Sequence, residues 1–297
     1  GQGKRMRSSI PKVLLPAWGK PIMQYLLEEI KWEEFGQRFL VVSPFMEELM
    51  KDNFGQEMRI VVQNEPKGTA HAASTVFPLI QEGIDWLLIL YADMPLLRRE
   101  TIFSFLSRVE ENHYLFSFLT SFSPHPTGFG RVVRDEKGEP LGIIEEKDSS
   151  PQEKEISEVS LGVFAFQKSA FQEVISLIDN CNVQREYYLT DAVRVAREQG
   201  YRPEAFVVDW DEQFLNVNTP AEFSKAISIL KERKIASLWD GGVKIIDPST
   251  TYIDWDVVVE EDVWLYPGTV IEGKSVIEKG ARIGPFSRIS ESKVGRN

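Results

Sequence analysis

The sequence predicts an α/β domain with a mostly parallel β-sheet, followed by a second domain of stacked β-coils. Two patterns in the 297-residue chain support this prediction. Short apolar segments alternate with amphipathic segments up to about residue 218, which is typical of strands and helices that alternate in one sheet. Beyond that region, apolar residues recur at every sixth position, which is typical of a solenoid.

The first half of the α/β segment contains helices and strands in turn. Gly19, Lys20 and Pro21 form a turn, and proline is favoured at the first position of a helix. The apolar residues after this turn have helical spacing, whereas residues 86–91 form a continuous apolar run typical of a buried strand. The expected elements are helix 22–30, strand 39–42, helix 45–53, strand 59–62, helix 69–81 and strand 86–91.

The second half of the α/β segment contains a predicted β-hairpin and several further elements. Residues 135–138 form the turn of the hairpin, and Gly200 caps the end of a helix. The expected elements are helix 100–112, strands 114–123, 131–134, 141–146 and 159–166, helices 169–178 and 188–199, and strand 205–208. An amphipathic helix from Pro220 to about Lys234 then connects this domain to the solenoid.

The solenoid is predicted from an unbroken six-residue period. The apolar residues of the period are Ile253, Val259, Leu265, Ile271, Ile277, Ile283 and Ile289. Two positions before each of them stands a small or β-branched residue, namely Thr251, Val257, Val263, Thr269, Ser275, Ala281 and Ser287. Seven consecutive repeats of this kind predict short strands stacked as the coils of a β-helix around a narrow core.

Composition restricts the class of protein. An apolar content of 42% is enough to fill a core, and a formal net charge of −11 disfavours binding to a nucleic-acid backbone. The one cysteine, Cys181, excludes an intrachain disulfide and fits a reducing compartment. The strongest apolar run, residues 86–92, has the length of a strand and is too short to cross a membrane. We therefore expect a cytoplasmic protein without membrane insertion.

Residues suited to phosphate and metal binding follow the predicted strands. Gln63 and Asp93 each come directly after an apolar strand, and ligands of open α/β sheets bind beyond the carboxyl ends of the strands. The first twelve residues contain two glycines and four basic side chains, a composition suited to a polyphosphate. The helix that begins at Thr69 directs its N-terminal amides to the same edge.

These segments occur in an order that resembles one enzyme family. The matching motifs are Gly1-Gln2-Gly3-Lys4-Arg5-Met6 with Pro11-Lys12, Gln63 with Gly68-Thr69-Ala70-His71-Ala72, Tyr91-Ala92-Asp93, Gly128-Phe129-Gly130-Arg131, Glu186-Tyr187-Tyr188-Leu189-Thr190-Asp191, and Asn218. Together with the solenoid, they resemble the bifunctional N-acetylglucosamine-1-phosphate uridyltransferase and glucosamine-1-phosphate N-acetyltransferase family over essentially the whole chain.

The resemblance implies a domain organisation and an activity. Residues 1–218 would form a Rossmann-like nucleotidyltransferase domain, residues 219–235 a connecting helix, and residues 236–297 the start of a left-handed β-helix that forms homotrimers. The implied enzyme transfers UMP from UTP to N-acetylglucosamine 1-phosphate. The products are UDP-N-acetylglucosamine, a precursor of peptidoglycan, and pyrophosphate.

The resemblance also implies roles for individual residues. Gly1, Arg5 and Lys12 would hold the UTP phosphates, with Arg5 and Lys12 assisting catalysis. Gln63, Gly68 and Thr69 would recognise uracil, and Gly130 and Glu145 would contact the amino sugar. Asp93 and Asn218 would hold Mg²⁺, which prefers oxygen ligands and keeps several waters. The reaction needs no side-chain nucleophile, because an oxygen of the sugar 1-phosphate attacks the α-phosphorus of UTP.

Three differences from the family restrict this interpretation. Family members have a strand ending in Leu-Ala-Ala before the position of Gly1, and their acetyltransferase residues lie in coils later than Asn297. We therefore expect a chain truncated at both ends and without acetyltransferase activity. The family also has asparagine at the position of Ser160, so sugar selectivity is less firmly predicted than nucleotidyl transfer.

Three alternatives remain at the level of sequence. The chain could use another sugar 1-phosphate or a thymidine nucleotide in the same reaction, act as a hexapeptide-repeat acyltransferase, or serve only to form oligomers. The roles of Tyr188 and Thr190, at a helix start or in a sugar pocket, are both left open. His71 receives no role, because the proposed mechanism needs no base at that position.

Overall fold

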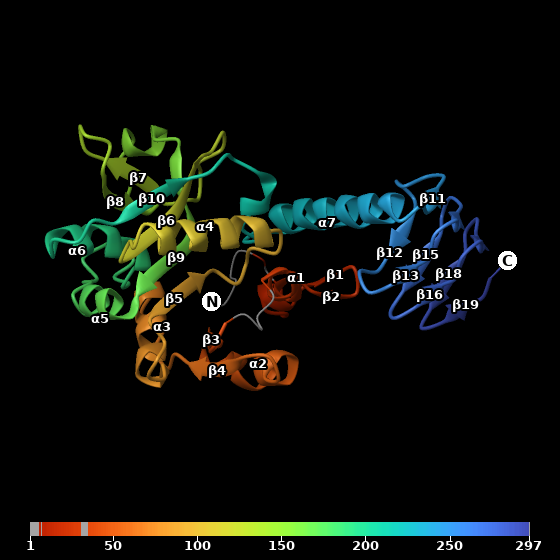
Figure 1. The fold of residues 1–297 in the computed structure, drawn as a ribbon, viewed down its shortest axis with the longest axis horizontal. Coiled ribbons are helices and arrows are strands. Elements are labelled where there is room, and N and C mark those ends of the chain that lie inside the picture. The colour runs from red at the N-terminus through yellow and green to blue at the C-terminus, as the bar shows by residue number, and fades with distance from the viewer. Residues whose placement is uncertain (1–5, 7, 31–34, 297) are drawn as a thin grey trace. The chain divides into compact units, whose positions relative to one another are not determined.

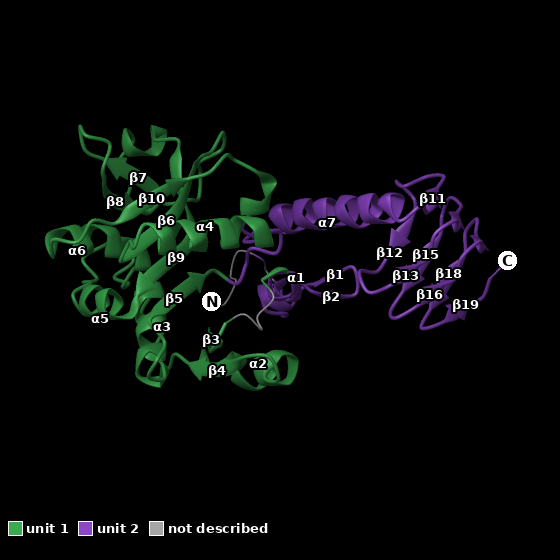
Figure 2. Ribbon diagram, viewed as in Figure 1, with its two compact units in different colours: residues 1, 29–91, 97–214 green, residues 2–28, 92–96, 215–297 purple. Residues whose placement is uncertain are grey.

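The computed structural model describes every residue of the chain except 1–5, 7, 31–34 and 297. The chain divides into two compact units (Figure 2). Unit 1 comprises residues 1, 29–91 and 97–214, and unit 2 comprises residues 2–28, 92–96 and 215–297. The predicted domain boundaries at residues 218 and 235 remain a prediction.

Unit 1 contains a six-stranded sheet (Figure 1). Its strands are β5 (Trp86–Leu90), β6 (Phe116–Phe122), β7 (Arg131–Arg134), β8 (Pro140–Ile144), β9 (Glu158–Gln167) and β10 (Glu204–Val207). The order is β10-β6-β9-β7-β8, and β5 also pairs with β9. Only β10 and β6 pair in parallel among these described strands, whereas β9 runs antiparallel to β5, β6 and β7.

The α/β fold class is confirmed, but the sheet is mixed and the expectation of a mostly parallel sheet is wrong. The β7–β8 hairpin reverses the chain at the turn Asp135–Gly138, and the following long strand β9 enters the sheet against the direction of β6. A parallel pair does form between β3 (Phe39–Val42) and β4 (Arg59–Val62), in a separate two-stranded sheet. Its crossover contains the helix α2 (Glu47–Phe54).

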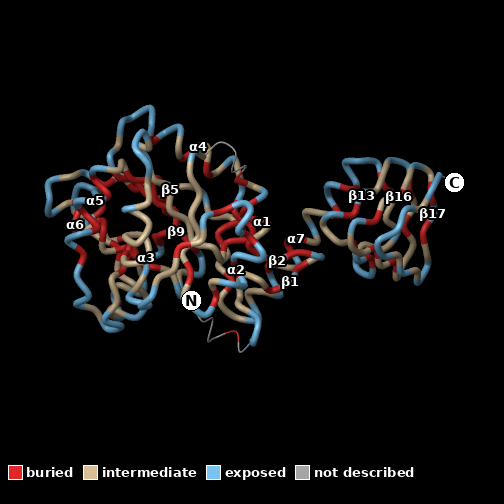
Figure 3. The backbone as a smooth tube through the Cα atoms, turned by 90° about the horizontal axis from the view of Figure 1, so that it is seen from below, coloured by how far each residue is buried: buried red, intermediate tan, exposed pale blue. Residues whose placement is uncertain are grey.

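The core of unit 1 lies between the sheet and its helices (Figure 3). The helices of this unit are α2, α3 (Thr69–Val76), α4 (Arg99–Glu111), α5 (Lys168–Ser176) and α6 (Ala192–Glu198). Phe116 of β6 stacks on Phe166 of β9 with ring centroids 4.0 Å apart, and Phe171 of α5 contacts Phe166 edge-on at 5.4 Å. Such aromatic pairs stabilise the fold beyond the burial of their area.

Several helices differ in length from the sequence-based expectation. Helix α3 ends at Val76, and the residues Phe77–Leu79 form a tighter 3₁₀ turn that contains Pro78. The predicted helix 188–199 begins with the 3₁₀ turn Leu189–Asp191 before α6. In each case a 3₁₀ turn lies next to the helix, and such turns are frequent at helix ends.

Unit 2 combines the start of the chain with the long helix α7 (Pro220–Asp240). The strands β1 (Pro16–Ala17) and β2 (Lys20–Pro21) form a hairpin that leads into α1 (Ile22–Glu29). Ile22 and Tyr25 of α1 and Leu230 of α7 share one buried apolar cluster. Helix α7 runs six residues beyond the predicted end at Lys234, because its sequence keeps helical spacing up to Leu238.

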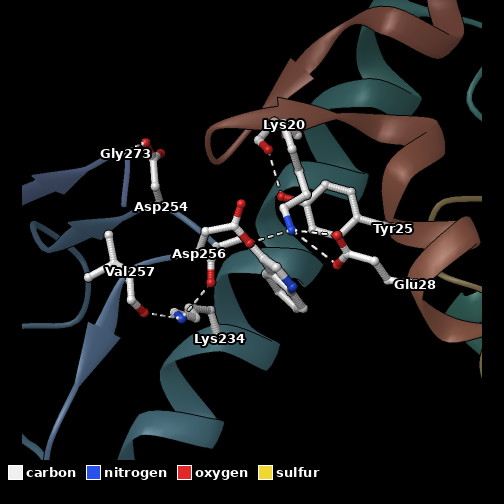
Figure 4. A network of polar contacts seen from close by, with 10 residues as sticks. Lys20, Tyr25, Glu28, Lys234, Asp254, Asp256, Val257 and Gly273 are labelled. Atoms are coloured by element: carbon white, nitrogen blue, oxygen red, sulfur yellow. Dashed lines mark hydrogen bonds and ion pairs between the residues drawn. The ribbon is translucent and has the colours of Figure 1, made fainter. Parts of the chain in front are cut away.

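A polar network in unit 2 joins the hairpin, α7 and the first coil of the solenoid (Figure 4). The ammonium of Lys20 contacts Glu28 at 2.8 Å and Asp256 at 2.6 Å, although its side chain is 7% exposed. Lys234 of α7 donates to the carbonyl of Val257 at 2.9 Å. Burial lowers the pKa of Lys234, and the nearby Asp256 counters this effect. Both lysines thus bind solenoid residues.

The solenoid confirms the hexapeptide prediction. Its strands are β11 (Lys244–Ile245), β12 (Tyr252–Ile253), β13 (Val258–Val259), β14 (Trp264–Leu265), β15 (Val270–Glu272), β16 (Val276–Ile277), β17 (Arg282–Ile283), β18 (Arg288–Ser290) and β19 (Lys293–Val294). They form three parallel sheets, and Tyr252 pairs with Val270, eighteen residues later, so three hexapeptides make one coil. The predicted small positions Thr269 and Ser275 are fully buried, as a narrow β-helix core requires.

Candidate active site

In unit 2, three side chains distant in sequence meet at one point. Lys12 lies in the 3₁₀ turn Lys12–Leu14, Asp93 follows strand β5, and Asn218 precedes helix α7. The ammonium of Lys12 donates to Oδ1 of Asn218 at 2.8 Å and also donates to Oδ2 of Asp93. The side chains of Lys12 and Asp93 are 17% and 13% exposed, so the ion pair is largely shielded from water.

The start of helix α7 holds Asn218 in position. Thr219 and Glu222 form a capping box, in which the Glu222 N–H donates to Oγ1 of Thr219 at 3.2 Å. The carboxylate of Glu222 accepts from the N–H groups of Thr219 and Asn218, both at 2.8 Å. The neighbouring Val217 N–H donates to the Asp93 carbonyl at 2.9 Å. These bonds fix the backbone of Asn218 next to that of Asp93.

The donor set of this point fits a hard divalent cation. The oxygens of Asp93 and Asn218 converge on a position that the Lys12 ammonium holds, so a positive charge is already stabilised there. Carboxylate and amide oxygens are ligands that magnesium accepts, usually together with waters and substrate phosphates. The described residues contain no group of three or more His, Cys, Asp or Glu that could hold a metal ion. A metal at Asp93 and Asn218 would therefore take its remaining oxygens from waters or a substrate.

In unit 1, the side chain of Gln63 orders the loop that leads into helix α3. Its amide nitrogen donates to the Gly68 carbonyl at 3.0 Å and lies 2.8 Å from Nδ1 of His71. Gly68 has a φ of +112°, and a Cβ at this residue would lie 2.4 Å from the Tyr187 carbonyl oxygen. Only glycine fits here, because both the backbone conformation and the space exclude a side chain.

The segment Tyr187–Thr190 connects this loop to Glu145. The Tyr187 carbonyl accepts from the Ala70 N–H at 2.9 Å, and the Leu189 N–H donates to Oγ1 of Thr69 at 2.9 Å. Further along, Oγ1 of Thr190 donates to Oε1 of Glu145 at 2.8 Å. The same carboxylate oxygen lies 3.8 Å from the position of a Cβ built on Gly130. One hydrogen-bonded chain therefore runs from Gln63 to Glu145.

Two carboxylates, at or near the Glu145 end of this series of hydrogen bonds, have raised pKa values. Burial raises the pKa of Glu145, while the hydrogen bond from Thr190 opposes the rise and the charges of Asp148 and Glu186 add to it. Burial also raises the pKa of Asp191 to about 6; Arg194 opposes this shift, and the charges of Asp179, Glu145 and Asp148 increase it.

The Asp191→Asn variant is expected to reduce the loss of stability between pH 4 and 6. The folded state holds the Asp191 proton more tightly than the unfolded state, so raising the pH through this window costs folding free energy. We compare the free energy of unfolding of the variant with that of the unmutated chain at each pH. This difference should be about 1–2 kcal/mol more favourable to the variant at pH 7.5 than at pH 4. Urea unfolding at both pH values measures the gain, and an equal difference at the two values would contradict it.

The structure groups most of the predicted site residues. Lys12, Asp93 and Asn218 share one contact point, and Gln63, Gly68 and Thr69 form one loop. Gly130 and Glu145 lie next to each other. Gly1 and Arg5 lie outside the described residues.

Sequence reasoning assigned no role to Tyr187 and His71 of the unit 1 network, and it left Thr190 open between a helix start and a sugar pocket. Tyr187 and Thr190 both belong to a recognised motif, and Thr190 directly contacts the predicted sugar residue Glu145. His71 was set aside, yet it lies against Gln63. A histidine in the first turn of a helix gives no signal of such a contact from spacing alone, because Gln63 lies outside that helix, directly after β4.

Comparison with known families identifies the class of protein. Residues 1–231 match the family model described as nucleotidyl transferase, and residues 256–291 match six repeats of the bacterial transferase hexapeptide model. The first match covers well over half of the chain, so the chain belongs to the nucleotidyl transferase family.

The relatives of the chain are more specific. It is 35% identical over 295 residues to the bifunctional protein GlmU of Clostridioides difficile (strain 630), covering 99% of this chain and 64% of that protein. It is 36% identical over 296 residues to the bifunctional protein GlmU of Geobacillus sp. (strain WCH70), covering 99% of this chain and 64% of that protein. It is 34% identical over 297 residues to the bifunctional protein GlmU of Carboxydothermus hydrogenoformans (strain ATCC BAA-161 / DSM 6008 / Z-2901), covering 100% of this chain and 66% of that protein.

These matches confirm the resemblance stated from the motifs. The chain spans slightly less than two thirds of the length of these relatives. Within the part of the chain that the structure describes, no helix combines the length and the apolar character needed to cross a membrane.

Proposed function

We propose that the chain transfers UMP from UTP to N-acetylglucosamine 1-phosphate, with release of pyrophosphate. The observation that carries this proposal is the convergence of Lys12, Asp93 and Asn218 on one cation-holding point. Similarity to the bifunctional protein GlmU supports the choice of substrates. The proposal places the reaction in the cytoplasm, in the supply of a peptidoglycan precursor.

Asp93 and Asn218 would hold the metal, which we propose to be Mg²⁺. When bound, it supplies a positive charge that neutralises the phosphate oxygens around the reacting phosphorus. Lys12 releases Asp93 and binds the triphosphate of UTP, where its charge stabilises the leaving pyrophosphate together with Arg5 and Gly1. An oxygen of the sugar 1-phosphate attacks the α-phosphorus in line, so the protein contributes positioning and charge rather than a nucleophile.

Gln63 supports the choice of uracil. Its amide nitrogen donates to the Gly68 carbonyl and lies against Nδ1 of the His71 ring, so its oxygen Oε1 is the group left to accept from a base. Uracil offers an N–H donor at N3, where neutral cytosine has a lone pair. A preference for UTP over CTP is the expected result.

Glu145 and Gly130 would bind the sugar. Glu145 accepts a hydrogen bond from Thr190, so we add Thr190 to the proposed sugar site as the residue that orients this carboxylate. Ser160 favours a second candidate function, which is nucleotidyl transfer to another sugar 1-phosphate. Its hydroxyl is buried and has no partner among the described residues, at the position where the family has asparagine. A site with this hydroxyl could accept another sugar 1-phosphate.

Assays over a panel of substrates decide between these functions. Pyrophosphate release would be measured with UTP, dTTP and CTP, each combined with N-acetylglucosamine 1-phosphate or glucose 1-phosphate. The proposal predicts the highest kcat/KM for UTP with the N-acetylated sugar. Equal or faster turnover of glucose 1-phosphate would replace the proposed substrate by the second candidate.

The Lys12→Met variant tests the metal site without an activity measurement. Removal of the ammonium leaves Asp93 and Asn218 without their shared cation, so we expect the metal-free variant to lose about 1–3 kcal/mol of stability. Added Mg²⁺ should raise the melting temperature of the variant more than that of the unmutated chain, because no ammonium competes for the oxygens. Lys51→Met, at an exposed pair with Glu47, is the control. Equal magnesium shifts in all three proteins would contradict the assignment.

The solenoid is the proposed basis of a homotrimer. Its hexapeptide coils match the family model of bacterial transferases, and we propose that they associate around a threefold axis. Sedimentation of the chain with and without residues 241–297 tests this association. We do not propose acetyltransferase activity for this chain.

A further inference from the structure

Arg131, the first residue of β7, is a buried cation outside the proposed site. Its side chain is 1% exposed, and burial of a guanidinium is unfavourable unless acceptors surround it. Nη2 donates to Oε2 of Glu146 at 2.6 Å, and Nη1 donates to the Phe129 carbonyl. Nε finds no acceptor among the described residues. An apolar side chain would fill this space without that penalty, so the two directional bonds are what arginine contributes.

Glu146 extends these bonds to the loop backbone. The oxygen Oε2 that accepts from Arg131 also accepts from the Gly128 N–H at 3.0 Å. Burial alone would raise the pKa of Glu146, but the Gly128 hydrogen bond and the Arg131 guanidinium hold it below the ordinary value. The carboxylate is therefore charged at neutral pH and binds both the loop and the guanidinium.

The loop Gly128–Gly130 is held along its whole length. Gly128 is bound by Glu146, the Phe129 carbonyl by Arg131, and the Gly130 carbonyl by the Ser160 N–H at 2.9 Å. A Cβ on Gly130 would lie 2.7 Å from Cγ2 of Ile143, so the backbone packs directly on β8. These contacts fix Gly130 beside Glu145, which lies one residue before Glu146.

We propose that Arg131 and Glu146 form a clamp that positions Gly130 and Glu145 for the sugar 1-phosphate. This inference rests on the proposed function, in which Gly130 and Glu145 contact the sugar. The clamp residues themselves touch no substrate; they act through the loop and the end of β8. The clamp therefore governs binding of the sugar substrate and leaves binding of the nucleotide unchanged.

Kinetics of three variants test the clamp. Glu146→Ala removes the shared acceptor, and we expect the KM for the sugar 1-phosphate to rise about tenfold with little change in the KM for UTP. Glu146→Gln keeps a carbonyl oxygen that can accept from both Gly128 and Arg131. Its KM for the sugar 1-phosphate should therefore stay close to that of the unmutated chain. The matched control is Arg134→Lys on the same strand, which breaks the two-bond pair with Glu158 at 2.6 and 2.7 Å. It should leave both KM values unchanged.

Amide hydrogen exchange of the substrate-free protein provides a readout independent of activity. We expect faster exchange at residues 128–131 in Glu146→Ala, and unchanged exchange there in Glu146→Gln and Arg134→Lys. A parallel rise in both KM values, or normal kinetics with unchanged exchange in Glu146→Ala, would overturn the clamp. If the unmutated chain turns over no sugar 1-phosphate, the proposed function fails and the sugar role fails with it, whatever the exchange rates are.

Discussion

The Asp93→Asn variant is expected to lose about a thousandfold in kcat, which corresponds to about 4 kcal/mol of transition-state stabilisation. Asparagine keeps the shape of the side chain and removes its negative charge. The charge balances the Lys12 ammonium in the substrate-free state and would bind the metal during the reaction. Pyrophosphate release under saturating UTP and sugar 1-phosphate measures the loss, with melting temperature as the check on folding.

Asp85→Asn is the matched control for this substitution. Asp85 is an exposed aspartate directly before strand β5, while Asp93 follows the same strand. The control should retain full activity. An Asp93→Asn variant that keeps more than about a tenth of the activity would show that a carboxylate at this position is not required.

The Gly68→Ala variant is expected to raise the KM for UTP by about a hundredfold. Alanine at a φ of +112° is strained, and its Cβ would lie 2.4 Å from the carbonyl oxygen and 2.7 Å from the nitrogen of Tyr187. Both atoms are backbone, so the loop must move. That movement breaks the hydrogen bond from Gln63 and displaces the proposed uracil site.

Gly83→Ala is the control for this prediction, because it adds backbone strain without a steric clash. Gly83 also has a positive φ, +84°, but nothing lies within 4 Å of its built Cβ. We expect this control to lose about 1 kcal/mol of stability and to keep its KM for UTP. A Gly68→Ala variant with an unchanged KM for UTP would remove the loop from the nucleotide site.

Local patterns of the sequence predicted the solenoid almost completely. The six-residue period can be recognised within a short stretch of the sequence. The structure places Thr269, Ile271, Ser275 and Ile277 inside the coil, as that period requires. The strand directions of the sheet in unit 1 were harder to predict. Strand β9 pairs with β5 and β6 across dozens of residues, and its continuous apolar sequence suits either direction.

The candidate site was predicted from motif resemblance more than from physical spacing. Lys12 and Asn218 are 206 residues apart, and no local pattern indicates that they meet. The resemblance named both residues but assigned Lys12 to the phosphates alone, so its contact with the two predicted metal ligands is new. The clamp on Gly130 also escaped prediction, because Arg131 begins β7 while Glu146 follows the end of β8, and no local spacing indicates that the two side chains pair.

Transfer of the α-phosphorus of UTP is the central step of the proposed function. The chain would be incubated with UTP labelled at the α-phosphorus, N-acetylglucosamine 1-phosphate and Mg²⁺, and the labelled products separated. We expect the label to appear in UDP-N-acetylglucosamine with equimolar pyrophosphate, and not when Mg²⁺ is chelated. Label that remains in UTP, or that appears only as UMP or UDP, would contradict the assignment of this chain as a uridylyltransferase.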